Sequence, residues 1–161
     1  MPYAAPVLAA LAECAHLLHD REILARAAVE AISKALPQAN WTGIYWLHGD
    51  VLDLGPYTGA PTEHVRIPVG SGVCGTAIAE NRDQVVDDVR ARKNYLACSA
   101  TTRSEIVVLI RAAGKVVGQI DIDSDRVAAF SAEEHSFLKM VAGALGSLLM
   151  DLPPTHPTSA V

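Results

Sequence analysis

The chain has 161 residues and a formal net charge of -5, and 50% of its residues are hydrophobic against 19% charged. That apolar content suffices for the core of one domain and argues against an intrinsically disordered chain. The acidic balance argues against a general binder of nucleic acid or anionic membranes, and no apolar run reaches the roughly 18–20 residues of a membrane span. The first ten residues contain no Lys or Arg, which is untypical of a secretory signal, so we expect a cytoplasmic protein.

Helices are predicted at both ends of the chain. Apolar residues recur at helical spacing over 4–19, and again between Asp20, an expected N-cap, and Pro37, which ends the second helix. Ser131 and Glu134 form a capping-box pattern before a last helix that runs to about Met150. We expect one domain over 1–152 and a flexible, Pro-rich tail over 153–161.

Strands are predicted between these helices. Aromatic and β-branched residues favour strands over 41–47, 51–54, 65–69, 84–89, 105–111 and 116–124. The connections are a Gly/Pro loop over 55–61, a glycine-rich entry to a helix over 70–79 and a long loop over 90–103. Short turns after the first and fifth strands predict hairpins, so we expect an α+β domain with a largely antiparallel sheet. The length of the last loop marks it as a candidate functional segment.

Carboxylates gather on one predicted strand. In the segment 119–123 side chains alternate, so Gln119, Asp121 and Asp123 share one face. Glu105 opens the neighbouring strand and is placed to lie beside the pair. A solvated face is an equally good interpretation of this pattern, but such a cluster is also able to bind an ammonium group or hold a proton for donation.

The three cysteines differ in their settings. Cys14 lies among apolar residues of the first helix and is expected to be an inert, packed thiol. Cys74 stands at the glycine-rich start of a helix, where the helix dipole favours a thiolate, and Cys98 lies in the long loop. Their spacing matches neither a C-x-x-C motif nor a zinc pattern, so spacing alone leaves a redox pair open. An odd number of cysteines is untypical of a disulfide scaffold, so we expect reduced thiols.

Two other patterns carry little weight. The six histidines are scattered and form no ligand pattern, so we expect no metal and no other cofactor. Gly70, Gly72 and Gly75 match the spacing of a dinucleotide fingerprint, but no βαβ unit surrounds them, so they are interpreted as a tight turn.

A series of motifs resembles one known family. These are, in chain order, Asn40-Trp41-Thr42-Gly43-Ile44-Tyr45, Leu54-Gly55-Pro56-Tyr57-Thr58-Gly59, the run from Val65 to Ala77 that contains Val-Gly-Ser-Gly-Val-Cys-Gly-Thr-Ala, Ala97-Cys98, Ser104-Glu105-Ile106-Val107 and Asp121-Ile122-Asp123-Ser124. They follow one another as in free methionine-R-sulfoxide reductases, which are GAF-domain enzymes. The resemblance runs from about Asn40 to Met150, and a generic GAF sensor would not be expected to carry the whole combination.

The resemblance implies a GAF-like, six-stranded antiparallel sheet with helices on both faces, often in a homodimer. It implies reduction of free L-methionine (R)-sulfoxide, with Cys98 as the catalytic cysteine, Cys74 as its disulfide partner and thioredoxin as the reductant. Glu105, Asp121 and Asp123 match carboxylates around the substrate, and Glu105 and Asp123 are expected to supply the proton. Trp41 and Tyr45 match the aromatic wall that holds the S-methyl group, although both would also serve as ordinary strand core.

The chain departs from this pattern at His64, where many family members have a third cysteine that can act as the resolving thiol. Cys74 would then have to resolve Cys98 directly. Two other functions stay open: a GAF module that senses a small ligand or redox state, and a catalytically inactive structural homodimer.

Overall fold

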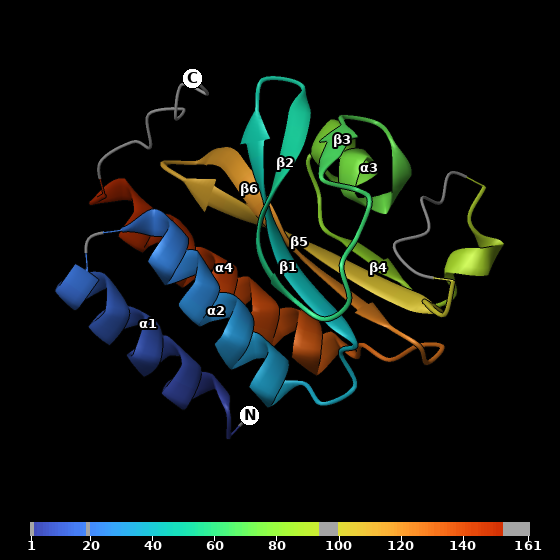
Figure 1. The fold of residues 1–161 in the computed structure, drawn as a ribbon. Coiled ribbons are helices and arrows are strands. Elements are labelled where there is room, and N and C mark those ends of the chain that lie inside the picture. Colours follow the sequence, from blue (N-terminus) through green and yellow to red (C-terminus); the bar gives the residue numbers. More distant parts are fainter. Residues whose placement is uncertain (1, 19, 94–99, 153–161) are drawn as a thin grey trace.

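The computed structural model describes residues 2–18, 20–93 and 100–152. The chain forms one six-stranded sheet. Figure 1 shows helices on both faces of this sheet. The helices are α1 (Ala4–Leu18), α2 (Arg21–Ala35), α3 (Gly72–Glu80) and α4 (Ala132–Met150), with a 3-10 turn at Val89–Ala91. The strands are β1 (Trp41–His48), β2 (Val51–Thr58), β3 (Arg66–Pro68), β4 (Gln84–Val86), β5 (Ser104–Ala112) and β6 (Lys115–Ser124).

The sheet has the order β3-β2-β1-β6-β5-β4, and every neighbouring pair is antiparallel. This confirms the predicted α+β architecture with a six-stranded antiparallel sheet, and both predicted hairpins, β1–β2 and β5–β6, are present. The Asp20 side chain accepts hydrogen bonds from the amides of Glu22 and Ile23, and Ser131 with Glu134 completes the capping box. Local capping therefore sets the start of α2 and of α4 as expected.

The two faces of the sheet have different partners. On one face α1, α2 and α4 cover the larger core, in which Ile44, Ile106, Ile120 and Ile122 pack against residues such as Phe137. The other face carries a smaller apolar cluster, to which the strands, including β3 at the edge, and the covering helix α3 contribute. Because side chains alternate along a strand, the Ile residues of β6 enter the large core while its acidic residues face the smaller layer.

The predicted loop over 55–61 is wrong in part, because β2 continues to Thr58. Tyr45 pairs with Leu54 and Gly43 pairs with Tyr57, so one residue of β1 faces the pair Gly55-Pro56 across a β-bulge. A bulge accommodates a proline inside a sheet because the extra residue leaves the ladder of hydrogen bonds. Gly and Pro, taken from the sequence as loop signals, mark an irregularity within a strand here.

Two smaller differences concern the connections. The strand predicted over 84–89 ends at Val86, and the 3-10 turn occupies the start of the long loop. Residues 94–99 of that loop and the proposed tail 153–161 lie outside the described residues. Within the described part of the chain, no helix combines the length and apolar character needed to cross a bilayer.

Candidate active site

Three carboxylates lie together on the face of the sheet covered by α3. The register places Glu105 of β5 opposite Asp123 of β6, and Asp121 follows two residues away on the same face. None of the three is more than 2% exposed. The predicted clustering of these side chains is confirmed, whereas the alternative of a solvated acidic face is wrong.

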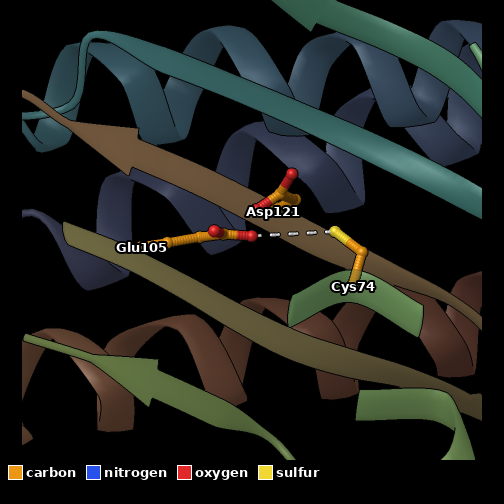
Figure 2. Close-up of side chains that lie close together, drawn as sticks. All are labelled: Cys74, Glu105 and Asp121. Atoms are coloured by element: carbon orange, nitrogen blue, oxygen red, sulfur yellow. Dashed lines mark hydrogen bonds between the residues drawn. The ribbon is translucent and has the colours of Figure 1, made fainter. Parts of the chain in front are cut away.

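Cys74 approaches this cluster from α3. Figure 2 shows its sulfur and the carboxyl groups of Glu105 and Asp121 pointing toward one another from three different elements. The Cys74 Sγ lies 3.9 Å from Glu105 Oε1, and ligand atoms of the three residues lie within 4.8 Å of one another. The thiol is itself buried. A cysteine and two carboxyl groups therefore meet in one desolvated volume.

Glycine is needed where α3 meets β3. A Cβ on Gly75 would come within 2.5 Å of the carbonyl oxygen of Pro68, so a larger residue would push the helix away. The amide of Gly75 donates to the carbonyl of Ser71, and its carbonyl accepts from the amide of Gly70. The glycine motif thus forms the predicted tight turn, and it places the first turn of α3, with Cys74, over the sheet.

Aromatic side chains form the next part of the site. Gly43 pairs with Asp121, and a Cβ on Gly43 would clash with the Trp41 indole, so the indole lies over this glycine, close to Asp121. The Trp41 Nε1 donates to the Ala60 carbonyl at 3.1 Å, and Tyr57 stacks on the indole with centroids 5.5 Å apart. Tyr57 was not among the predicted site residues, because its segment was interpreted as a loop.

Tyr45 lies on the same face of β1 as Trp41, four residues further along the strand. The ring centroids of Trp41 and Tyr45 are 6.2 Å apart, and Tyr45 is fully buried. Its hydroxyl donates to the backbone carbonyl of His64 at 2.8 Å. Both predicted wall residues therefore belong to one aromatic group beside the acidic cluster, and each has its polar atom fixed by a backbone acceptor.

The environment of the cluster favours bound protons. Burial, followed by the charges of Asp121 and Asp123, raises the pKa of Glu105 well above its usual range, while Arg92 opposes this rise. Burial raises the pKa of Asp121 to about 6, with Cys74 and Glu105 opposing. Near neutral pH, Glu105 is therefore the residue that retains a proton, and Asp121 is the one that ionises first.

Asp121→Asn should increase stability, and more so at alkaline pH. Folding raises the pKa of Asp121 from an ordinary 3.8 to about 6. The contribution of this side chain to the free energy of unfolding is therefore complete at low pH and is lost as pH rises through 6. We expect a gain of about 1–3 kcal/mol in the free energy of unfolding at pH 8 and a smaller gain at pH 5. Urea denaturation at both pH values measures it.

The exposed carboxylate of Asp125, at the end of the same strand, supplies the control for this comparison. Asp125→Asn should show no such dependence on pH. Equal stability of Asp121→Asn and the unsubstituted protein at pH 8 would contradict the inferred cost of ionising this buried group.

Gln119 lies on the same face of β6 as the carboxylates, two residues before Asp121. It lies between Tyr45 and Leu109 in the sheet, is fully buried, and neither amide atom has a hydrogen-bond partner among the described residues. A buried amide in that state costs about 1–3 kcal/mol relative to a satisfied one. Strand alternation in the sequence placed Gln119 on this face but indicated no role for it, because the pattern does not show that the side chain is buried.

The structure bears on two further predictions, the position of Cys98 and the absence of a metal site. Cys98 lies outside the described residues, so its distance from Cys74 and from the carboxyl groups stays a prediction. The expectation of no metal site rested on the histidines, yet the atoms of Cys74, Glu105 and Asp121 are close enough to hold an ion. A thiol and two carboxyl groups at this spacing are able to bind a cationic group.

Comparisons with known proteins identify the fold and the family. A GAF domain family model matches residues 19–150. The free methionine-R-sulfoxide reductase of Escherichia coli is 37% identical over 142 residues, which is 88% of this chain and 77% of that protein.

Two solved structures resemble the chain closely. The free methionine-R-sulfoxide reductase of Neisseria meningitidis, in complex with its substrate, superposes with a TM-score of 0.84 at 31% identity, over 92% of this chain and 88% of that one. The fRMsr of Staphylococcus aureus, also in complex with substrate, has a TM-score of 0.82 at 34% identity, over 91% and 95% of the two chains. This protein belongs to the free methionine-R-sulfoxide reductase family of GAF-domain proteins.

Proposed function

We propose that this protein reduces the R epimer of free methionine sulfoxide to methionine, using Cys98 as nucleophile and Cys74 as resolving thiol. The observation that carries the proposal is the buried group of Cys74, Glu105 and Asp121 beside aromatic side chains. A proton donor, a negative charge and an apolar wall are the three features that a sulfoxide of a free amino acid requires. The activity named for the free methionine-R-sulfoxide reductases of Escherichia coli and Neisseria meningitidis agrees with this combination.

The carboxyl cluster supplies the proton. A sulfoxide sulfur is electrophilic, but its oxygen leaves sulfur only after protonation, so a thiolate alone is insufficient. Glu105 retains a proton near neutral pH because it is buried among other carboxyl groups. It donates this proton to the sulfoxide oxygen, and Asp123, directly opposite Glu105 in the sheet, shares the task.

The thiol chemistry then proceeds in two steps. The Cys98 thiolate attacks the sulfoxide sulfur, the oxygen is transferred to the cysteine as a sulfenic acid, and methionine leaves. The Cys74 sulfur attacks the sulfenic sulfur, releasing water and forming a Cys74–Cys98 disulfide. A dithiol reductant, which we propose is thioredoxin, returns both cysteines to thiols. The net reaction consumes one sulfoxide and one dithiol and yields methionine, water and one disulfide.

Selectivity for the free amino acid follows from charge. Asp121 ionises more readily than Glu105, and its carboxylate forms a charge-assisted hydrogen bond with the substrate ammonium, worth about 1.5–3 kcal/mol. A methionine within a protein has no ammonium group to offer. Trp41 and Tyr45 contact the S-methyl group, so methyl and oxygen occupy an apolar and an acidic position, which distinguishes the two epimers.

Turnover with separate substrates tests the proposal. In the presence of thioredoxin, thioredoxin reductase and NADPH, we expect oxidation of NADPH with the free R epimer, and little with the S epimer or with peptide-bound sulfoxide. A sensor module would bind a ligand without consuming NADPH. Equal rates with the free and the peptide-bound substrate would contradict the role assigned to Asp121.

The assembly and the location of the protein stay predictions. The homodimer is inferred from the family resemblance, and sedimentation equilibrium of the purified chain measures it. The proposed cytoplasmic location rests on the reduced state expected for the thiols.

A further inference from the structure

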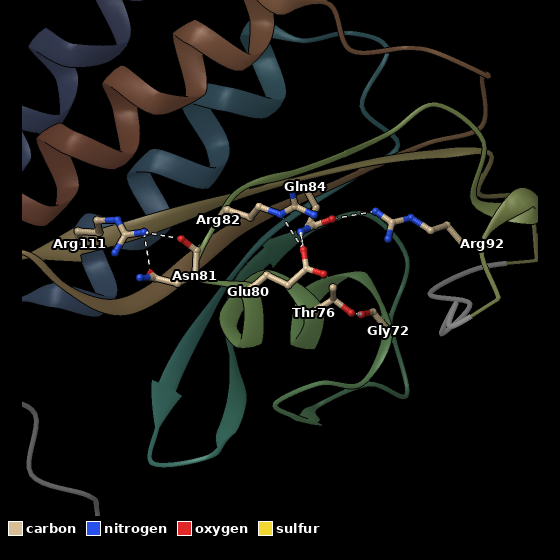
Figure 3. Close-up of polar contacts among 8 residues, drawn as sticks. All are labelled: Gly72, Thr76, Glu80, Asn81, Arg82, Gln84, Arg92 and Arg111. Atoms are coloured by element: carbon tan, nitrogen blue, oxygen red, sulfur yellow. Dashed lines mark hydrogen bonds and ion pairs between the residues drawn. The ribbon is translucent and has the colours of Figure 1, made fainter.

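Arg92 is a cation that the proposed chemistry does not yet use. It follows the 3-10 turn at the start of the loop that leads to Cys98, and it is half-buried. Its Nη2 donates to Gln84 Oε1 at 2.8 Å, and Gln84 Nε2 donates to Glu80 Oε2 at 2.9 Å. Figure 3 shows this chain of side chains, with Arg82 bound to the same Glu80 oxygen. The guanidinium is therefore held by a relay that starts on α3.

The register of the sheet shows which face the relay occupies. Gln84 of β4 pairs with Val107, and Val107 pairs with Asp121, so the side chains of this row leave the same face. Glu105 lies two residues from Val107 on β5 and is thus a diagonal neighbour of Gln84, at about 7–8 Å between Cα atoms. Arg92, bonded to Gln84, stands at the edge of the acidic face.

The electrostatics of Glu105 agree with this placement. Burial first, and then Asp121 and Asp123, raise the pKa of Glu105, whereas Arg92 is the cation that acts in the opposite direction. By contrast, Arg111 binds the backbone and side chain of Asn81, toward the opposite end of β5.

A free amino acid carries an ammonium group and a carboxylate on the same carbon atom. The acidic cluster suits its ammonium group, and an adjacent cation is needed for its carboxylate. We propose that Arg92, oriented by Gln84 and Glu80, binds the α-carboxylate of the substrate. This inference deepens the proposed function and rests on it. A guanidinium suits the task because its parallel N–H groups match the two oxygens of a carboxylate, and the bond to Gln84 fixes its orientation.

Kinetics with a neutralised substrate test the assignment. The substrates are free methionine R-sulfoxide and its α-carboxamide, which keeps the ammonium group and lacks the carboxylate. We expect Arg92→Met to raise KM for the free acid about 10- to 100-fold with little change in kcat, since it removes a charge-assisted bond present throughout the reaction. With the carboxamide, Arg92→Met and the unsubstituted protein should have the same KM.

Two further variants complete the test. Arg92→Lys should recover part of the affinity for the acid, because it restores the charge without the fork of donors. Arg111→Met removes one arginine at a distance from the acidic cluster, and it should leave KM for both substrates unchanged. If Arg92→Met weakened the binding of the free acid and of the carboxamide equally, Arg92 would only support the structure of the loop, and the assignment would be overturned.

Calorimetry separates this inference from the proposed function. Methionine, the product, and methioninamide are titrated into the unsubstituted protein and into Arg92→Met. Tighter binding of methionine, lost in the variant, supports the carboxylate contact even if no turnover is seen. Turnover of the free sulfoxide together with equal binding of the two ligands would leave the function intact and refute the contact.

Discussion

Cys98→Ser should abolish reduction of the sulfoxide even in a single turnover, whereas Cys74→Ser should still form one methionine per subunit and then stop. The reason is that the two sulfurs act in different steps of the reaction. Cys98 forms the bond that displaces methionine, and Cys74 acts only afterwards, on the sulfenic acid. Rapid-quench measurement of methionine with enzyme in excess tests the loss in Cys98→Ser. Methionine formed per subunit, with sulfoxide in excess and the thioredoxin system present, tests whether Cys74→Ser stops after one event.

Cys14→Ser is the matched control. Cys14 lies on α1, on the opposite side of the sheet, where it packs against the larger core and its sulfur is 3.9 Å from the carbonyl of Ile23. This variant should keep full turnover. Should Cys74→Ser recycle at the normal rate with thioredoxin, Cys14 or direct reduction of the sulfenic acid would be responsible, and the resolving role of Cys74 would be wrong.

The acidic cluster was accessible to sequence analysis because its geometry follows from the period of a strand. Alternation of side chains put Ile120 and Ile122 on one face and the acidic residues on the other, and the short hairpin turn placed Glu105 next to Asp123. Such arguments depend on local spacing alone. They succeed here because β5 and β6 are neighbours both in the chain and in the sheet.

Contacts between distant segments were less accessible. Cys74 and Glu105 are 31 residues apart, and only the family resemblance placed them in one site. Arg92 reaches Gln84 through a 3-10 turn that composition does not predict. Tyr57 was missed because Gly55 and Pro56 normally indicate a loop, whereas a bulge absorbs them within β2. In each case the deciding information is the packing of one element on another.

Glu105→Gln should slow the formation of methionine in a single turnover by about 10²–10⁴-fold, the usual range for loss of a general acid. The amide keeps the size of the side chain and removes the proton. In the unsubstituted protein, the rate should fall as pH rises through the elevated pKa of Glu105, because the ionised carboxylate has no proton to give. This alkaline decline should be absent in Glu105→Gln.

A fall in activity through misfolding is distinguishable from this effect. Glu105 is buried beside Asp121 and Asp123, so removal of its ionisable group should leave the free energy of unfolding unchanged or raise it at alkaline pH. Glu133→Gln, at an exposed position of α4, is the matched substitution and should change neither rate nor stability. A folded Glu105→Gln with the normal rate and the normal pH profile would remove Glu105 from the chemistry and leave Asp123 as the proton donor to test.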